Sequence, residues 1–323
     1  MRTTIGITGM ICVRCAHSIE SALNTLPGVS AEVAYAKELA MITSSAEVGT
    51  ERLLETIRSR GYGATLTQAA RRDGSAQGSK KALHIAIIGS GGAAFAAAIK
   101  AVERGARVTL IEAGTLGGTC VNVGCVPSKI SLRAAHIAHE IEAHPFKGLA
   151  HHDARVDRQA LVAQQTARVE QLRQAKYQSI LDDTPEIELL RGWARFTDAH
   201  TLAVETEQGE RRLRPDRILI ATGAAPAIPP IPGLAQTPYW TSTEALVSTE
   251  QPEHLVVIGA SYVALELAQA FRRLGSQVTL LARSTLLSTL DPELGAGLQA
   301  ALADEGVQLL TQTHVTRAEY RGA

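Results

Sequence analysis

The sequence predicts an α/β protein, with a doubly wound, Rossmann-like fold preceded by a small α+β domain of the ferredoxin-like type. Three patterns support this prediction. Over residues 1–66 the hydrophobic periodicity follows the order βαββαβ. From Leu83 onward, continuous apolar strands alternate with helices, which is typical of a parallel sheet covered on both faces. Two glycine turns, at Gly89 and Gly259, each separate such a strand from a helix.

The composition narrows the class of protein. The chain has 323 residues, 45% of them hydrophobic, which argues against disorder and allows roughly two or three domains. Its 32 basic residues balance 32 acidic ones, and the chain therefore lacks the positive field of a nucleic-acid-binding protein. The sequence shows neither a signal peptide nor a long uncharged apolar stretch, and we expect a soluble cytoplasmic protein.

The first domain is expected over residues 1–66. Alternating apolar residues predict strands, and apolar residues three or four positions apart predict helices. The strands fall at 3–8, 29–35, 39–43 and 62–66, and the helices begin near Ala16 and Leu53. Residues 67–82 contain almost nothing large and apolar, and this composition predicts a flexible linker.

The second domain, expected over residues 83–250, opens with a G-x-G-x-x-A turn between a strand and a helix. Its small residues permit a tight turn, the approach of a pyrophosphate and close packing of the helix on the sheet. These residues are Gly89, Gly91 and Ala94. Glu112 ends the next strand, where a carboxylate can accept hydrogen bonds from a ribose. The turn therefore predicts a dinucleotide site. A polar helix, packed on one face, is expected at 156–181.

The third domain, expected over residues 251–323, repeats the turn in a weaker form. Gly259 follows a strand, but Ser261 replaces the middle glycine, so a pyrophosphate would have to clear a side chain. The next strand ends at Arg283 instead of an acid, which favours a 2′-phosphate and hence NADP over NAD. An ordinary surface arginine is the alternative.

The four cysteines form two close pairs, which suits reactive or metal-binding thiols in a reducing compartment. Cys120 and Cys125 lie five residues apart at a helix start, where they can close a small loop as a disulfide. We expect the helix-end N–H groups and Lys129 to lower the thiolate pKa.

The stretch G-G-T-C-x-N-x-G-C-x-P-S-K at 117–129, following the first glycine turn, resembles the pyridine nucleotide–disulfide oxidoreductases. The resemblance covers residues 83–323. It implies FAD in the first nucleotide site and NAD(P)H in the second, with electrons passing through the flavin to a Cys120–Cys125 disulfide. Cys125 would form the charge-transfer complex with the flavin, and Cys120 would be the interchange thiol that faces substrate.

The same resemblance assigns further site residues. Lys129 would lie near the flavin N5 and pair with Glu266, and Tyr262 would gate the nicotinamide pocket. The positions that match flavin contacts are Gly114, Thr119, Ala194, Thr222 and Gly223.

The N-terminal motif G-M-I-C-V-R-C-A resembles the heavy-metal-associated domains. Cys12 and Cys15, three residues apart, suit linear coordination of a soft ion such as Hg(II) or Cu(I). Ile11 replaces the threonine that is usual in that motif. A thioredoxin-like redox pair is the alternative, although the preceding Gly-Met and the element order argue against it.

A soft-metal domain joined to a flavin disulfide reductase resembles the mercuric reductase branch of that family. The resemblance implies NADPH-dependent reduction of Hg(II) to Hg(0) for mercury detoxification. Cys12 and Cys15 would capture Hg(II) from small thiols or from a membrane mercury transporter, and pass it to Cys120 and Cys125. It also implies a homodimer with active sites shared between subunits. His136 and His139 could bind metal, but an ordinary place on a helix is the favoured interpretation.

The family's downstream flavin-binding motif, dimerisation domain and C-terminal vicinal cysteines have no counterpart before Ala323. We therefore expect the N-terminal part of a longer enzyme, with weak FAD retention and little turnover of its own. Two alternatives are kept. One is another flavin disulfide reductase, similar to dihydrolipoamide dehydrogenase, and the other is a soft-metal-binding or trafficking protein without turnover.

Overall fold

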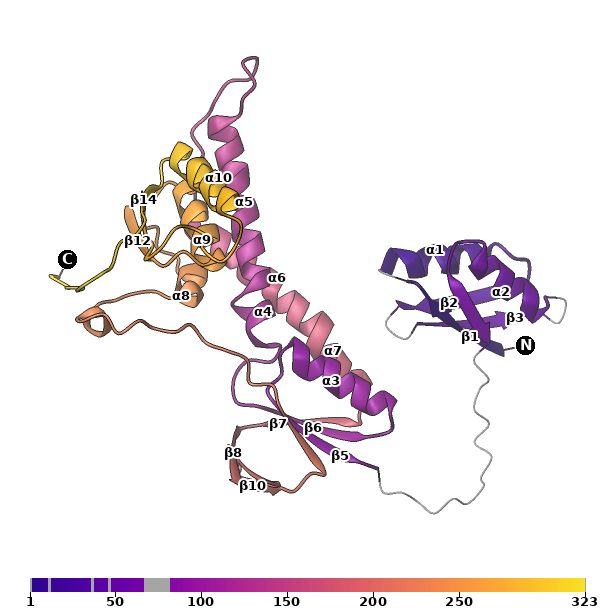
Figure 1. Cartoon of the computed structure of the whole chain (residues 1–323). Helices are drawn as coiled ribbons and strands as arrows, with labels where there is room; N and C mark the ends of the chain where they lie inside the picture. The colour runs from indigo at the N-terminus through magenta and orange to yellow at the C-terminus, as the bar shows by residue number, and fades with distance from the viewer. Residues whose placement is uncertain (1, 11–12, 36–37, 46–47, 67–81, 323) are drawn as a thin grey trace. The chain divides into compact units, whose positions relative to one another are not determined.

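The computed structural model describes residues 2–10, 13–35, 38–45, 48–66 and 82–322 (Figure 1). The chain divides into two compact units, residues 1–80 and 81–323, and each unit is considered by itself. Most of the predicted linker, residues 67–81, lies outside the described residues.

The first unit is a four-stranded antiparallel sheet covered by two helices, in the strand order β2-β3-β1-β4. This arrangement confirms the predicted βαββαβ fold. Its elements are β1 (Arg2–Thr8), α1 (Val13–Asn24), β2 (Val29–Ala34), β3 (Leu39–Ser44), α2 (Thr50–Arg58) and β4 (Gly63–Leu66).

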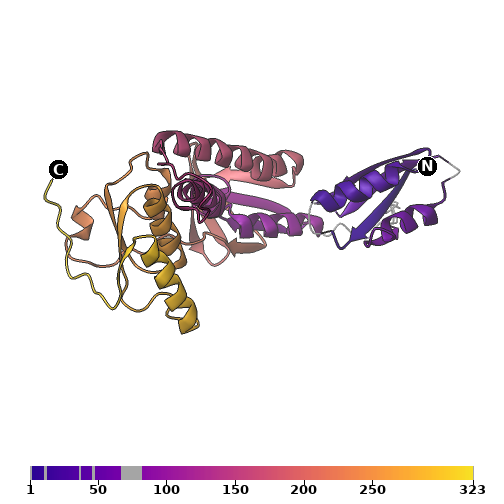
Figure 2. The ribbon, with the colours of Figure 1, turned by 90° about the horizontal axis from the view of Figure 1, so that it is seen from above.

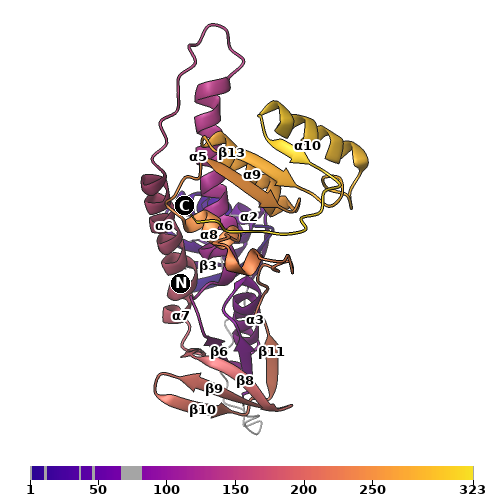
Figure 3. The same cartoon turned by 90° about the vertical axis from the view of Figure 1, so that its left-hand side faces the viewer.

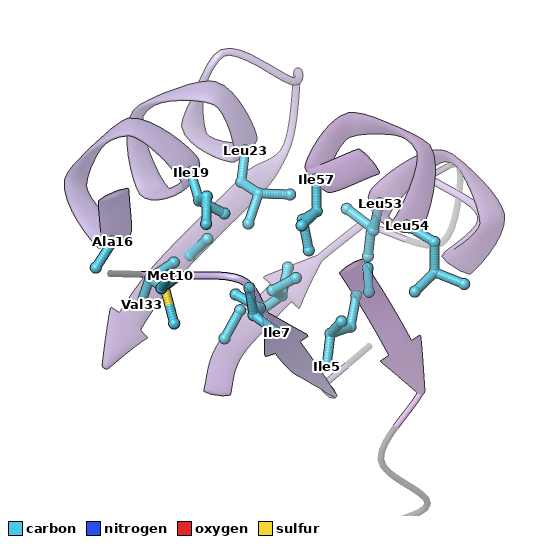
Figure 4. Close-up of a cluster of buried hydrophobic side chains, with 14 residues drawn as sticks. Ile5, Ile7, Met10, Ala16, Ile19, Leu23, Val33, Leu53, Leu54 and Ile57 are labelled. Atoms are coloured by element: carbon cyan, nitrogen blue, oxygen red, sulfur yellow. The ribbon is translucent and has the colours of Figure 1, made fainter. Parts of the chain in front are cut away.

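The core of this unit lies between the two helices and the sheet. Figure 4 shows side chains of both helices pointing at those of the strands. Residues three or four apart on a helix share a face, as do alternate residues on a strand. The side chains that this periodicity buries completely are Ile5 and Ile7 on β1, Ile19 and Leu23 on α1, and Leu53 and Ile57 on α2.

The second unit contains a parallel sheet in the strand order β11-β5-β6-β7, which is the predicted Rossmann-like layer. Its elements are β5 (His84–Ile88), α3 (Gly92–Glu103), β6 (Arg107–Glu112), β7 (Ile187–Arg191) and β11 (Arg217–Ile220). An antiparallel sheet of β8 (Trp193–Asp198), β9 (Thr201–Thr206) and β10 (Gly209–Leu213) is inserted between β7 and β11.

Helices between β6 and β7 carry the thiol motif. They are α4 (Gly118–Asn122), α5 (Cys125–Ala143), α6 (Arg158–Arg173), the π-helical segment η2 (Gln174–Gln178) and α7 (Ser179–Asp183). The prediction of one regular helix at 156–181 is wrong, because the π-helical segment interrupts it. Hydrophobic periodicity cannot show that the hydrogen bonds there span one residue more than in an α-helix. The wider turn places Tyr177 edge-on to Phe95, with ring centroids 5.0 Å apart.

A second parallel sheet, β12-β13-β14, forms the other nucleotide fold. Its elements, with two short preceding helices, are η3 (Leu234–Gln236), α8 (Ser242–Val247), β12 (His254–Ile258), α9 (Tyr262–Arg273), β13 (Gln277–Leu281), α10 (Pro292–Asp304) and β14 (Gln308–Leu310). Figure 2 looks along α5, which lies between the pink α6 and the orange α9. Within the described residues, no helix is long and apolar enough to cross a membrane.

A buried arginine of α6 joins the helices to the second nucleotide fold. Arg158, 5% exposed, donates to the carbonyl oxygens of Ala245 at 2.7 Å and Ser248 at 3.2 Å. Its guanidinium also lies 5.2 Å from the ring centre of Phe271 on α9, a cation–π contact. Burial lowers the pKa of Arg158. Figure 3 shows α6 and α8 next to each other beside α5.

Candidate active site

The first glycine turn joins β5 to α3 and leaves the start of the helix open. Gly89 has a φ of 109°, and a Cβ there would lie 2.3 Å from the carbonyl oxygen of Ala221 at the end of β11. Gly91 is the N-cap of α3 and makes no side-chain cap. The first N–H groups of the helix are therefore available to an anion, together with the positive end of the helix dipole.

Glu112 is fixed at the carboxyl end of β6. Its Oε1 accepts from the Gly114 N–H at 2.6 Å, and its Oε2 accepts from the hydroxyl of Ser90. The Ser90 Oγ, 1% exposed as a residue, accepts in turn from the Gly117 N–H at 3.2 Å. The carboxylate keeps free lone pairs for a further donor. No sequence signal marks Ser90, because it occupies a variable position of the glycine motif.

Glycines also bring residues 117–125, here called the thiol loop, against this turn. Gly117 and Gly118 have φ values of 103° and 68°, and a Cβ on Gly118 would lie 2.7 Å from the Gly91 Cα. Thr222 and Gly223 follow Ala221, whose N–H donates to the Ile88 carbonyl at 2.8 Å, and so they adjoin the same turn. The open helix start, the glycine contacts and the fixed carboxylate together fit a dinucleotide.

The other residues expected at the flavin site lie in three places. Gly114 and Thr119 are exposed, the first beside Glu112 and the second on α4. Ala194 is half-buried on β8 and packs against the cluster that contains Ile111. Ala94 is fully buried on α3, which agrees with the close helix packing that the motif predicts.

The two thiols come from successive helices. Cys120 lies in α4, Cys125 is the first residue of α5, and both are exposed and unbridged in the structure. A hydrogen bond with Cys125 raises the pKa of Cys120, with burial as a smaller cause. The expectation of a lowered thiolate pKa is therefore wrong for Cys120. A second sulfur next to the first disfavours a negative charge there.

An ion pair connects the thiol helix to the second nucleotide fold. The Nζ of Lys129 lies 2.5 Å from Oε1 of Glu266 on α9. Lys129 is one helical turn after Cys125, and Glu266 is one turn after Tyr262, so each pair shares a helix face. Both charged side chains are partly exposed, at 60% and 41%, and the pair is therefore weak as a source of stability. Tyr262 is 62% exposed at the start of α9.

Tyr177 joins the site without any signal in the sequence. A Cβ on Gly117 would lie 3.3 Å from the Tyr177 ring, so the ring packs beside the thiol loop. Burial raises the pKa of Tyr177, and the charges of Cys120 and Cys125 raise it further. The residue lies in the π-helical segment, which sequence periodicity did not reveal.

The second glycine turn is capped. Gly259 has a φ of 119° and donates its N–H to the Leu281 carbonyl at 2.9 Å. Ser261 is the N-cap of α9, and its Oγ accepts from the Ala264 N–H at 3.3 Å. The hydroxyl of Ser261 thus caps α9, a structural role beyond replacing the middle glycine of the motif. Arg283 is exposed two residues beyond β13.

In the first unit, Cys15 is half-buried on α1 and packs against the core cluster that contains Met10 and Ala16. Cys12 lies outside the described residues. In the second unit, the Nε2 of His136 lies 3.3 Å from Glu140, one turn along α5. Among the described residues, no group of three or more His, Cys, Asp or Glu side chains could hold a metal ion.

Comparison with known proteins decides the family. Residues 83–323 match the pyridine nucleotide-disulphide oxidoreductase family, and residues 4–63 match the heavy-metal-associated domain. The chain belongs to the pyridine nucleotide-disulphide oxidoreductase family.

Relatives of this family resemble the chain along almost its whole length. The mercuric reductases of Acidithiobacillus ferrooxidans and Shigella flexneri are each 53% identical to it over 98% of its residues. The chain spans 58% and 60% of those two proteins. Among solved structures, the HOCl-induced flavoprotein disulfide reductase RclA from Escherichia coli aligns with a TM-score of 0.64 at 31% identity. That alignment covers 74% of this chain and 51% of RclA.

Proposed function

We propose that this chain reduces Hg(II) to Hg(0) with electrons from NADPH, and that Cys120 and Cys125 hold the metal during the reaction. The observation that carries the proposal is the position of the two exposed thiols. They lie on a loop that packs against an open dinucleotide turn, in a chain that is 53% identical to mercuric reductases. The sequence identity makes the metal the favoured substrate over a dihydrolipoamide-type disulfide.

The first turn would hold FAD. Gly89 and Gly91 would admit its pyrophosphate at the start of α3, and Glu112 would accept from its ribose. When bound, the flavin supplies a route for two electrons from a nicotinamide to the thiol site. Gly114, Thr119, Ala194, Thr222 and Gly223 are the further contacts that we propose.

The second turn would hold NADPH. The guanidinium of Arg283 is exposed just beyond β13, where it can meet a 2′-phosphate. Tyr262 is exposed at the start of α9 and would cover the nicotinamide. The ion pair of Lys129 and Glu266 links α5 to α9 beside the thiols, where the two helices also pack through Ala138 and Ala270.

The thiol pair suits a soft metal. Thiolates bind Hg(II) tightly enough to win it from other cellular thiols, and exchange between thiolates keeps its transfer fast. Each incoming thiolate displaces one outgoing thiolate, so the metal stays two-coordinate between exchanges. The Tyr177 ring, next to the loop, would limit access to the bound metal from that side.

The first unit would deliver the metal. Cys12 and Cys15 would capture Hg(II), from small thiols or from a membrane transporter, and pass it to Cys120 and Cys125. We also propose a homodimer with active sites shared between subunits, because the resemblance to the pyridine nucleotide-disulphide oxidoreductases implies one.

A spectroscopic titration tests the proposal. The flavin-loaded chain is titrated with NADPH and then with Hg(II), while flavin absorbance is recorded. We expect the flavin band to bleach with NADPH and to return with stoichiometric Hg(II). The proposal would be overturned if the bleached band did not return on addition of Hg(II), or if it returned equally in Cys125→Ala.

A further inference from the structure

The loop that carries Cys120 is tied together by the side chain of Asn122. Asn122 is the last residue of α4, and its Nδ2 donates to the carbonyl oxygens of Leu116 and Gly118, each at 2.9 Å. Both carbonyls precede Cys120 in the chain, so the amide joins the end of the short helix to its beginning. Because a helix of five residues has little stability of its own, this side chain helps to fix the position of Cys120.

Arg173, the last residue of α6, holds the same amide from its other end. Its Nη1 donates to the Asn122 Oδ1 at 2.9 Å, and its Nη2 pairs with Glu170. The side chain of Arg173 is 26% exposed, so solvent screens the contact only in part. A guanidinium can only donate and a backbone carbonyl can only accept. The Asn122 Oδ1 must therefore face Arg173, and its Nδ2 must face the carbonyl oxygens.

The segment around Cys120 is also held by the buried side chains of Leu116 and Val121, and by the Gly117 N–H, which donates to Ser90. Gly117 and Gly118 precede Cys120 with left-handed φ values, and Gly124 follows it with a φ of −131°. The Val123 N–H donates to the Thr119 carbonyl at 2.9 Å, which closes α4 locally but does not connect it to another element. The contact between Arg173 and Asn122 connects this loop to a long helix.

We propose that Arg173 and Asn122 form a positioning bridge that keeps Cys120 within reach of Cys125 and thereby stabilises the disulfide of this pair. The inference rests on the proposed function only in taking Cys120 and Cys125 as the redox pair. Holding two thiols close together raises their effective concentration and favours the intramolecular disulfide.

The redox step is an exchange with a small disulfide. The two Sγ atoms form a bond and give up two electrons and two protons, and glutathione disulfide takes them up and is cleaved to two glutathione thiols. The equilibrium constant of this exchange measures how well the loop holds the two sulfurs together.

The test measures that constant in the full chain. Cys12→Ser and Cys15→Ser are included, so that only the Cys120–Cys125 pair can form a disulfide within the chain. Samples are equilibrated in glutathione buffers, alkylated and analysed by mass spectrometry. Loss of one charge-assisted hydrogen bond predicts that Arg173→Met lowers the constant about fivefold to tenfold. Arg173→Lys should lower the constant by a smaller factor. The matched control is Arg168→Met, because Arg168 lies on the same helix and bonds Gln171 on α6 itself, and it should leave the constant unchanged.

A double-mutant cycle shows whether Arg173 acts through Asn122. We expect Asn122→Ala to lower the constant at least as much, and addition of Arg173→Met to this variant to lower it no further. Equal constants for Arg173→Met and Arg168→Met would overturn the bridge, as would multiplicative effects in the cycle. The exchange needs neither Hg(II), FAD nor NADPH. A failure of the proposed function would therefore leave this equilibrium measurable, and the two failures are distinguishable.

Discussion

The two glycine turns of the second unit share one backbone design. In each, a glycine with left-handed φ follows a strand and donates its N–H to the neighbouring strand, at 2.8 Å from Gly89 and 2.9 Å from Gly259. Even the starts of the strands match. His84 pairs with Thr109, and His254 with Thr279, each with Nε2 to Oγ1 at 2.9 Å.

The side chains around the turns differ. A Cβ on Gly89 would collide with the Ala221 carbonyl, whereas a Cβ on Gly259 would meet nothing within 4 Å. The first helix lacks a side-chain cap, and the second is capped by Ser261. The first turn is thus packed tightly and open to an anion, while the second is loosely packed and already has one N–H satisfied. One backbone design, with different neighbours, can serve two different nucleotides.

The largest expected difference concerns the two glycines themselves. Gly89→Ala combines left-handed strain with a backbone collision, and should lower the free energy of unfolding by about 3 kcal/mol or more. Gly259→Ala carries the strain alone and should cost about 1–2 kcal/mol. Urea unfolding followed by tryptophan fluorescence measures both, because Trp193 and Trp240 lie in the second unit. Equal losses would contradict the difference in packing.

The next effect concerns Arg283, which lies just beyond the end of β13 in the second nucleotide fold. Arg283→Gln removes a charged donor from the proposed 2′-phosphate site, and should weaken NADPH binding about tenfold. Binding of NADH should stay unchanged and serves as the internal control. Isothermal titration with both nucleotides measures the two affinities, and parallel loss of both would show that Arg283 does not read the 2′-phosphate.

A smaller effect concerns the thiols beside the first turn. Because the hydrogen bond with Cys125 raises the pKa of Cys120, Cys125→Ala should lower that pKa. The pH at which iodoacetamide modifies Cys120 at half its maximal rate should then move down. Lys129→Met should leave this pH unchanged, since Glu266 pairs with the ammonium. Peptide mass spectrometry follows the rate, and an upward shift in Lys129→Met would restore the role that the sequence predicted for this lysine.

The smallest effect concerns the cap of the second turn. Ser261→Ala should lower the free energy of unfolding by about 1 kcal/mol, and Ser261→Gly by only a few tenths. Urea unfolding compares the two variants. Losses of the same size in both would show that the hydroxyl does not stabilise α9.

Much of the fold followed from the sequence, because periodicity and glycine motifs report local structure. A strand precedes and a helix follows each of Gly89 and Gly259, as the glycine turns predicted, and Lys129 and Glu266 do lie together. The missed residues act over long separations. Ser90 fixes Glu112, and Tyr177 reaches the thiols from a π turn. No periodic pattern reveals such contacts, since they depend on how distant elements pack.

The prediction of a lowered pKa for Cys120 failed for a similar reason. The sequence places Lys129 four residues after Cys125, and the resemblance pairs it with Glu266, but the ammonium is not among the causes that shift the pKa of Cys120. The sequence cannot show that the nearest influence on Cys120 is a hydrogen bond with the second sulfur. The electrostatics of the site depend on tertiary contacts, although the residue types were visible from the start.

Release of Hg(0) in a single turnover tests whether the Cys120–Cys125 pair takes part in the reduction. The chain is mixed with excess FAD, NADPH and stoichiometric Hg(II) bound to a small thiol, and the volatile metal is collected. We expect Hg(0) from the natural chain and from Cys12→Ser/Cys15→Ser given free access to Hg(II), and none from Cys125→Ala. Release at the same rate from Cys125→Ala would contradict this expectation.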